Sequence, residues 1–138
     1  MKRFVLDASV ALAWFLDNPV APLALRIKRA LLGGARAVVP ALWHLEMANG
    51  LVVAERRRIL TPADVTRSLM QGEQLAAQIT THSDLVSARQ ALATARAFQL
   101  SAYDAVYLDT ARNAGLPLAT LDRGMRAAAG RAAVELFE

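Results

Sequence analysis

The chain has 138 residues, 55% of them hydrophobic and 20% charged, a balance that predicts a single globular domain over residues 1–138 and excludes disorder. Sixteen Lys and Arg against 12 Asp and Glu leave a net charge of +4, which favours anionic partners such as phosphate backbones. Cysteine is absent, so disulfides and thiolate metal sites are excluded, and no uncharged stretch approaches the roughly 18 residues of a membrane span. We therefore expect a cytoplasmic protein without membrane contact.

Short apolar runs alternate with helical stretches in the first half of the chain. Pro19 and Pro22 separate two predicted helices, Gly33-Gly34 ends the second of them, and Pro40 stops a strand. In chain order, the predicted elements are a strand at 4–6, a helix that begins near 9, a helix at 23–32, a strand at 37–39 and a long helix from 41 to about 58.

The second half continues the alternation. Thr61 as N-cap, Pro62 at the first helical position and Asp64 in the first turn predict a helix start. The predicted elements are a helix to about 78, a weak strand at 79–81, a helix at 84–98, a helix from the Ser101 cap to Gly115, a strand at 116–121, a short helix at 123–129 and a strand at 134–137. Strands alternating with helices predict an α/β fold, with a short, mostly parallel sheet of four to five strands covered on both faces.

Four acidic residues fall where such a sheet brings distant segments together. Asp7 and Asp122 each come directly after a predicted strand. Glu46 lies early in the helix after the second strand, and Asp104 lies in the first turn of the helix capped by Ser101. Because open parallel sheets bind ligands outside the carboxyl ends of their strands, we expect these carboxylates to converge on one rim. Their mutual repulsion predicts a positive ion among them.

The composition narrows the choice of that ion. With no cysteine and only His44 and His82, the available ligands are carboxylate oxygens, which suit Mg²⁺ or Mn²⁺ and argue against zinc. A metal held in this way activates water and neutralises the charge that grows on a phosphoryl group. The pattern thus favours phosphodiester hydrolysis by water, without a protein nucleophile.

Four blocks of sequence carry a family resemblance. VLDASVALAWFL, PALWHLEMANGL, SAYDAVYLDTA and LPLATLD, in this order and spacing across essentially the whole chain, resemble the acidic blocks of the PIN-domain ribonucleases, in particular the VapC-like toxins of bacterial and archaeal toxin–antitoxin pairs. The resemblance implies a PIN-like three-layer sandwich. It also implies a Mg²⁺- or Mn²⁺-dependent endoribonuclease that cleaves RNA, forms a homodimer, and is covered by a small cognate antitoxin.

The same resemblance assigns roles to individual residues. It implies that the catalytic, metal-binding pocket consists of Asp7, Glu46, Asp104 and Asp122. Nearby polar support is implied for Ser9, Asn49 and Thr120. Asp109 has no counterpart in the family pattern, so we assign it no role.

Simpler structural roles compete with each catalytic one. Asp7 and Asp122 each precede a helix and have the residue type of an N-cap, whose carboxylate accepts backbone N–H bonds. Ser101 and Asp104 resemble a capping box in which Asp replaces the usual Glu or Gln. Arg56–Arg58 fit the solvated C-terminus of a helix better than an RNA grip, and Tyr103 with Tyr107 is predicted as a packed pair.

Two other function classes remain at this point. A phosphoryl-accepting regulatory domain or phosphatase also uses an Asp at a strand end with Mg²⁺, although Ser9 stands where a second acid is expected and both lysines precede residue 30. A catalytically inactive protein-binding module would use the acids only as caps. The intact set of four acids favours the nuclease over both.

Overall fold

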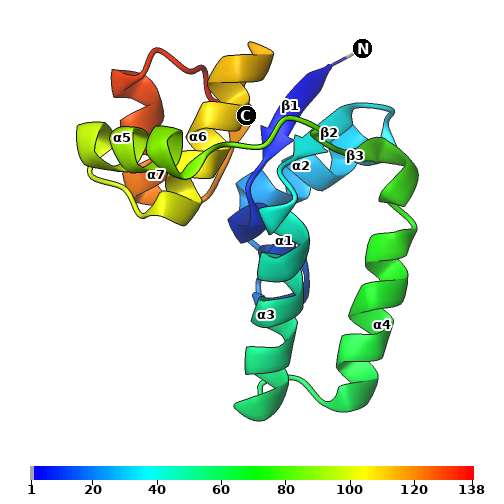
Figure 1. Cartoon of the computed structure of the whole chain (residues 1–138). Coiled ribbons are helices and arrows are strands. Elements are labelled where there is room, and N and C mark those ends of the chain that lie inside the picture. Colours follow the sequence, from blue (N-terminus) through cyan, green and yellow to red (C-terminus); the bar gives the residue numbers. More distant parts are fainter. Residues whose placement is uncertain (1) are drawn as a thin grey trace.

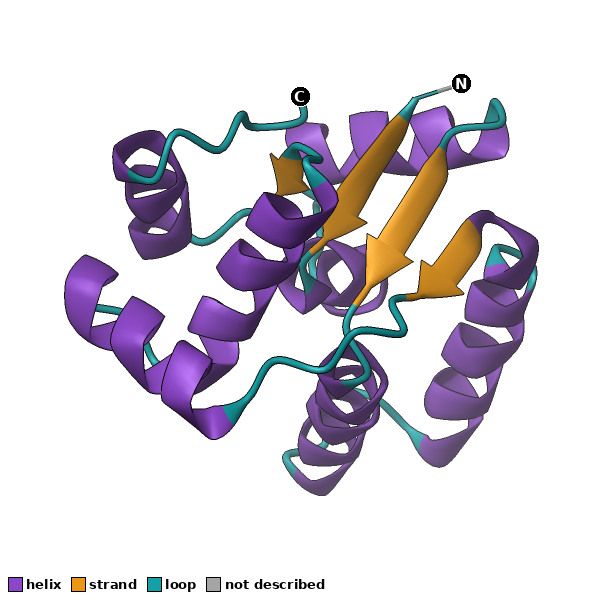
Figure 2. Ribbon diagram, turned by 45° about the horizontal axis from the view of Figure 1, so that its top comes forward, coloured by secondary structure: helices purple, strands orange, loops and turns teal. Residues whose placement is uncertain are grey.

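The computed structural model describes residues 2–138, which form a four-stranded parallel sheet flanked by seven α-helices (Figures 1 and 2). The strand order is β3-β2-β1-β4, with every neighbouring pair parallel. The strands are β1 (Arg3–Leu6), β2 (Arg36–Val39), β3 (Ile79–Thr81) and β4 (Leu118–Ala119). The sheet therefore confirms the predicted α/β class, and its strand count lies at the lower end of the predicted range.

Helices cover both faces of this sheet. They are α1 (Ala8–Leu16), α2 (Pro22–Leu32), α3 (Leu42–Arg56), α4 (Pro62–Glu73), α5 (Ala88–Phe98), α6 (Ala102–Ala114) and α7 (Arg123–Arg131), with a 3₁₀ turn at Ala76–Gln78. Side chains alternate between faces along a strand. Phe4 and Leu6 accordingly pack on α1 and α2, whereas Val5 packs on α6 and α7. All three side chains are fully buried, so β1 is the centre of two apolar layers.

Two predicted helix boundaries are wrong. The helix expected to reach Gln78 ends at Glu73, because the chain tightens there, with the Leu75 N–H bonded to the Gly72 carbonyl at 3.0 Å, and buries Leu75 in the core. The helix expected from Asp84 begins at Ala88, because the Ser87 hydroxyl accepts the Gln90 N–H at 3.1 Å and so acts as the N-cap.

Both predicted C-terminal strands are shorter than expected. The strand predicted over 116–121 comprises only Leu118 and Ala119, since Pro117 has no N–H for a ladder and the chain turns at Thr120. The strand predicted over 134–137 is a single bridge between Leu136 and Leu118. It nevertheless covers the outer edge of β4, and the ring of Phe137 stacks on Phe4 with centroids 4.1 Å apart.

The helices α3 and α4 extend away from the sheet as a pair, as Figure 1 shows. Near its middle, α3 approaches α1 closely at Gly50, where a Cβ would lie 2.5 Å from Leu12 Cδ2. Glu46 precedes Gly50 by about one helical turn, and Asp7 lies just before α1. The absent side chain thus allows the two helices to bring these acids near each other. None of the helices formed by residues 2–138 has the length and apolar character needed to cross a membrane.

Asp109, which the sequence leaves without a role, lies buried between α5 and α6. It is 2% exposed, and its Oδ1 accepts a hydrogen bond of 2.7 Å from the Thr94 hydroxyl. Within the described part of the chain, its Oδ2 has no partner. Burial raises the pKa of Asp109, while the Thr94 hydroxyl and the Arg112 charge act in the opposite direction. The Thr94 hydroxyl and the Arg112 charge therefore together offset part of the cost of burying this carboxylate.

We predict that Thr94→Val lowers the free energy of unfolding at pH 7 by about 1–3 kcal/mol, because it leaves a buried carboxylate without its donor. Urea denaturation measures this loss. The pKa of Asp109 is raised above its unfolded value of 3.8, so its unfavourable charge is relieved as the pH falls, and the loss should shrink towards pH 4.

Two further variants control for changes in packing. Thr94→Ser keeps the hydroxyl and is expected to lose much less, and Asp109→Leu in the Thr94→Val background should recover part of the stability, because no buried charge remains. An equal loss in Thr94→Ser, or a loss independent of pH, would show that the hydroxyl does not support Asp109.

Candidate functional site

The carboxyl ends of β1 and β4 lie side by side and carry the first and last of the four predicted acids. Asp7 directly follows β1, and its backbone N–H donates to the carbonyl of Ala119 in β4 at 3.0 Å. Asp122 follows β4 as the N-cap of α7. Residues separated by more than a hundred positions are thus held at one edge of the sheet by the parallel pairing of two short strands.

Asp7 is held by two hydroxyl groups. Its side chain is 5% exposed, and its Oδ2 accepts hydrogen bonds from Ser9 Oγ at 2.6 Å and Thr120 Oγ1 at 2.7 Å. Although Asp7 occupies the N-cap position of α1, its carboxylate makes no capping hydrogen bond there. The arrangement therefore differs from the simple capping role that competed with a catalytic one.

Each hydroxyl is in turn fixed by the backbone after β4. The Leu121 N–H donates to Ser9 Oγ at 3.1 Å, and the Asp122 N–H donates to Thr120 Oγ1 at 3.1 Å. The backbone N–H groups fix the two hydroxyl oxygens, and each hydroxyl donates its proton to Asp7, because an ionised carboxylate can only accept. The loop of residues 120–122 thereby sets the position of the Asp7 carboxylate.

Glu46 meets a buried phenol that sequence analysis did not connect to it. The hydroxyl of Tyr107 donates to Glu46 Oε1 at 2.6 Å across the boundary between α6 and α3. The predicted pairing of Tyr107 with Tyr103 is wrong, since Tyr107 is fully buried and Tyr103 is 64% exposed. The available signal was helical spacing, because Tyr107 lies three residues after Asp104 and therefore shares its face of α6.

Asp104 and Asp122 both take part in helix capping, in different ways. The Asp104 backbone N–H donates to Ser101 Oγ at 3.1 Å, so the cap uses the main chain of Asp104. The reciprocal bond that completes the capping box at Thr61 and Asp64 has no counterpart here among the hydrogen bonds of residues 2–138. Asp122 is a true side-chain cap, with Oδ1 accepting the Met125 N–H at 2.8 Å.

The acids act on one another electrostatically. Burial raises the pKa of Asp7, the hydroxyls of Ser9 and Thr120 lower it, and the charge of Asp122 raises it further. Burial also raises the pKa of Glu46, as do the charges of Asp7 and Asp104, against the lowering effect of the Tyr107 bond. The pKa of Asp104 is raised by burial and by the charges of Asp7 and Asp122. The four carboxylates thus form one repulsive cluster.

The acids influence one another electrostatically over longer distances than those that separate the ligands of one metal ion. Across residues 2–138, no three His, Asp or Glu side chains lie close enough to hold one ion together. The donor set nevertheless consists of hard carboxylate oxygens, the ligands that Mg²⁺ and Mn²⁺ prefer. Mg²⁺ commonly binds through one or two carboxylates and keeps water as its other ligands. The arrangement therefore fits an ion that retains part of its hydration.

Two further residues adjoin the cluster. Asn49, predicted as polar support, lines an open hollow of about 540 Å³ together with Glu46, Tyr103 and Leu12. Arg126 on α7, which received no sequence-based role, donates to the carbonyl of Thr120 at 3.0 Å and forms an ion pair with Glu138. Its position four residues after Asp122 on one helix was the only signal of its proximity. Arg126 thus anchors the loop that positions Asp7.

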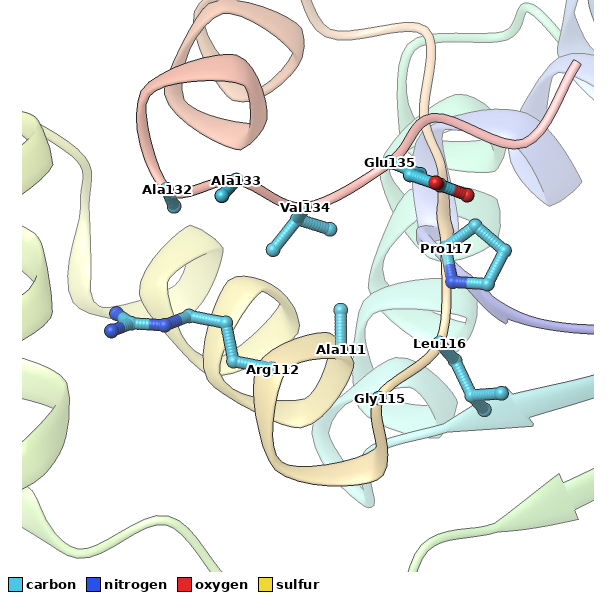
Figure 3. A pocket seen from close by; sticks show the side chains of 9 residues that line it. All are labelled: Ala111, Arg112, Gly115, Leu116, Pro117, Ala132, Ala133, Val134 and Glu135. Atoms are coloured by element: carbon cyan, nitrogen blue, oxygen red, sulfur yellow. The ribbon is translucent and has the colours of Figure 1, made fainter.

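The hollow drawn in Figure 3 lies elsewhere. It has a volume of about 510 Å³ and is bordered by Gly115, Leu116 and Pro117, which precede β4, and by residues 132–135. Glu135 is the one acid among its lining residues. Since Asp122 follows β4, the acidic cluster belongs to the opposite end of that strand, and we assign this hollow no part in the site.

Comparison with known proteins gives a consistent result. The family model for the PIN domain matches residues 4–131. Among solved structures, PAE2754 from Pyrobaculum aerophilum is 22% identical with a TM-score of 0.70, over 92% of this chain and 84% of that chain. FitAcB from Neisseria gonorrhoeae is 21% identical with a TM-score of 0.63, over 98% and 96% of the two chains.

A domain of a functionally unknown protein from Methanocaldococcus jannaschii is 15% identical with a TM-score of 0.61, over 99% of this chain and 90% of that one. At these identities the structural matches establish the shared fold. Comparison with curated proteins finds no match. Because the PIN model spans most of the sequence, the chain belongs to the PIN domain family.

Proposed function

We propose that this chain is a Mg²⁺- or Mn²⁺-dependent endoribonuclease that acts as the toxin of a toxin–antitoxin pair. The observation that carries the proposal is the cluster of Asp7, Glu46 and Asp104, with Asp122 beside it. These carboxylates come from separate elements and are at least partly buried in three cases. The charge of Asp122 raises the pKa of Asp7, and the charge of Asp7 raises the pKa of both Glu46 and Asp104. A structure gains nothing from such repulsion unless a cation compensates it.

The family supports the reaction class. PIN domains are in general metal-dependent nucleases, and many are toxins of toxin–antitoxin systems. The resemblance of all four acidic blocks to VapC-like toxins supports the narrower assignment. Family membership also argues against the phosphoryl-accepting domain that the sequence alone left open.

The chain's own residues would share the work as follows. Asp7, Glu46, Asp104 and Asp122 would hold the divalent ion, directly or through its water. When bound, the ion supplies Lewis acidity, which activates water for attack and neutralises charge on the phosphoryl group. Ser9 and Thr120 hold the Asp7 carboxylate in place and partly offset the rise of its pKa on burial, because donated hydrogen bonds favour the charged form. Asn49, which lines the same hollow as Glu46, would donate to an oxygen of the RNA.

The proposed partners are RNA, a second copy of the chain and a cognate antitoxin. The net charge of +4 favours RNA, and Arg56–Arg58 are exposed at the C-terminus of α3, where cations are also favourable for the helix. Large apolar side chains are exposed on α4, including Leu69 and Met70. Such side chains support protein partners for a homodimer and an antitoxin. We place the activity in the cytoplasm, where RNA is accessible.

We predict that Mn²⁺ stabilises the protein by about 2.7 kcal/mol at one hundred times its dissociation constant, because it binds only the folded acidic cluster. The folded pKa values of Asp7, Glu46 and Asp104 are raised, so without metal these groups contribute stability below about pH 4 that is lost as the pH rises through those values. The metal-induced rise in Tm should therefore grow from pH 5 to pH 7.5. Thermal scans with Mn²⁺ and with chelator measure it, and an equal rise at both pH values would contradict the site.

Asp7→Asn is expected to reduce Mg²⁺-dependent RNA cleavage by more than about 100-fold, beyond the 10–100-fold typical of residues that only support a ligand. The variant should stay folded, since it removes a buried charge. Asp17→Asn is the matched control, because it removes an exposed acid at the other end of α1. Cleavage assays, circular dichroism and growth arrest on expression provide the readouts. Full cleavage by Asp7→Asn would remove the proposed nuclease centre.

Ser101→Ala and Asp104→Asn separate helix capping from catalysis. Ser101→Ala should cost about 1 kcal/mol of unfolding free energy and leave cleavage unchanged, because it removes the cap alone. Asp104→Asn keeps the capping N–H and should retain stability while cleavage is lost. Denaturant unfolding and cleavage are measured for both variants. If Asp104→Asn cleaves RNA like the unmodified protein, Asp104 serves the helix and not the reaction.

A further inference from the structure

The hydroxyl of Tyr107 joins two helices that carry acids of the candidate site. Tyr107 belongs to α6, and its hydroxyl donates to Glu46 Oε1 of α3 at 2.6 Å. Tyr107 follows Asp104 by three residues on α6, so one phenol connects the helix that carries Asp104 with the side chain of Glu46.

Packing fixes this phenol independently of its polar partners. The Tyr107 side chain is fully buried in the cluster formed by Val5, Leu108 and Met125 with their neighbours. Its ring therefore cannot follow the carboxylate of Glu46 if that carboxylate moves. Glu46 of α3, in contrast, has a long side chain with several rotatable bonds and is only half-buried. The rigid partner determines the position of the flexible one.

Core packing alone does not account for the hydroxyl. A Phe at this position would present the same ring to the cluster. A buried Tyr hydroxyl finds a partner in most proteins, and here that partner is a carboxylate, which makes the hydrogen bond charge-assisted and short. The carboxylate also belongs to the repulsive acidic cluster, so without a donor Glu46 has reason to turn away from Asp7 and Asp104.

We propose that Tyr107 is a positioning residue, whose hydroxyl holds Oε1 of Glu46 and so keeps the other carboxylate oxygen of Glu46 for a divalent cation or its water. The inference rests on the proposed function, because it assumes that Glu46 serves a metal site. It adds to that function a buried residue that never contacts the ion. Residues of this kind, which hold a ligand from behind, commonly change metal affinity by 10–100-fold when altered.

The test compares Tyr107→Phe with Tyr103→Phe, which removes an exposed hydroxyl from the same helix. Mn²⁺ binding is measured by calorimetry without RNA, and Tm is measured without metal. We expect Tyr107→Phe to bind Mn²⁺ about 10–100-fold more weakly, and Tyr103→Phe to bind it unchanged. Glu46→Gln should weaken binding as well, and adding Tyr107→Phe to it should change little, because the phenol acts through Glu46.

A merely structural role predicts a different pattern. In one such outcome, Tyr107→Phe lowers Tm but does not weaken Mn²⁺ binding. In another, Tyr107→Phe weakens Mn²⁺ binding by the same factor whether residue 46 is Glu or Gln. Either result overturns the inference. Should Tyr107→Phe not fold, Glu46→Asp replaces it, since a carboxylate shortened by one CH₂ group does not reach the phenol. Glu46→Asp is then expected to show the same 10–100-fold loss, and unchanged Mn²⁺ binding would overturn the inference.

The inference and the proposed function fail in distinguishable ways. If the unmodified protein binds Mn²⁺, Asp7→Asn does not, and Tyr107→Phe binds normally, the metal site stands and the role of Tyr107 is rejected. If the unmodified protein neither binds Mn²⁺ nor cleaves RNA, the proposed function is rejected and the role of Tyr107 with it. RNA cleavage that falls in parallel with Mn²⁺ affinity in Tyr107→Phe supports both.

Discussion

The repulsion between carboxylates at one edge of the sheet is the constraint on which this structure depends. Asp7 lies almost fully buried at the end of β1. The charge of Asp122 raises the pKa of Asp7, and the charge of Asp7 in turn raises the pKa values of Glu46 and Asp104. Hydroxyl groups offset part of this repulsion by donating hydrogen bonds to the carboxylates. Ser9 and Thr120 donate to Asp7, and Tyr107 donates to Glu46. Each of these donors is itself held by backbone or by the apolar core. The fold thus opposes the repulsion with fixed dipoles rather than with basic side chains.

The parallel pairing of β1 with β4 explains how segments that are distant in sequence together position Asp7. The β1–β4 contact places Asp7 beside the loop of residues 120–122, and the backbone N–H groups of that loop orient the hydroxyls that hold Asp7. Arg126 ties the same loop to α7 and, through Glu138, to the last residues of the chain. The C-terminal segment, although it forms a single bridge, therefore supports the geometry of the first strand's end.

The sequence was informative where a single local signal decides the outcome. Phe4–Leu6 is apolar on both faces and forms a buried parallel strand, and Thr61-Pro62 marks the start of α4, as predicted. Boundaries that depend on tertiary contacts were not predictable in this way. The helix α4 ends before Leu75 because Leu75 packs into the core. The strand β4 ends after Ala119 because Thr120 turns towards Asp7. Local propensity contains neither contact.

The same distinction applies to the candidate site. The residue types and their places in the chain indicate which acids gather, and the structure puts Glu46, Asp104 and Asp122 within electrostatic reach of Asp7. Tyr107 was missed because its partner Glu46 is remote in sequence, and Arg126 was missed because its bond to the Thr120 carbonyl depends on how the chain turns between β4 and α7. Helical spacing relates each of them only to a neighbouring acid, and it does not reveal a hydrogen bond across elements.

The close approach of α1 and α3 at Gly50 has a consequence for this arrangement. Glu46 and Asp7 repel each other, so the close approach of the helices beside them depends on packing away from the charges. Gly50 permits that packing, because a Cβ there would lie 2.5 Å from Leu12 Cδ2. A glycine inside a helix costs about 0.5–1 kcal/mol relative to alanine. The fold accepts this loss of helical stability about one turn from Glu46, because a side chain at position 50 would have to displace Leu12 or separate α1 from α3.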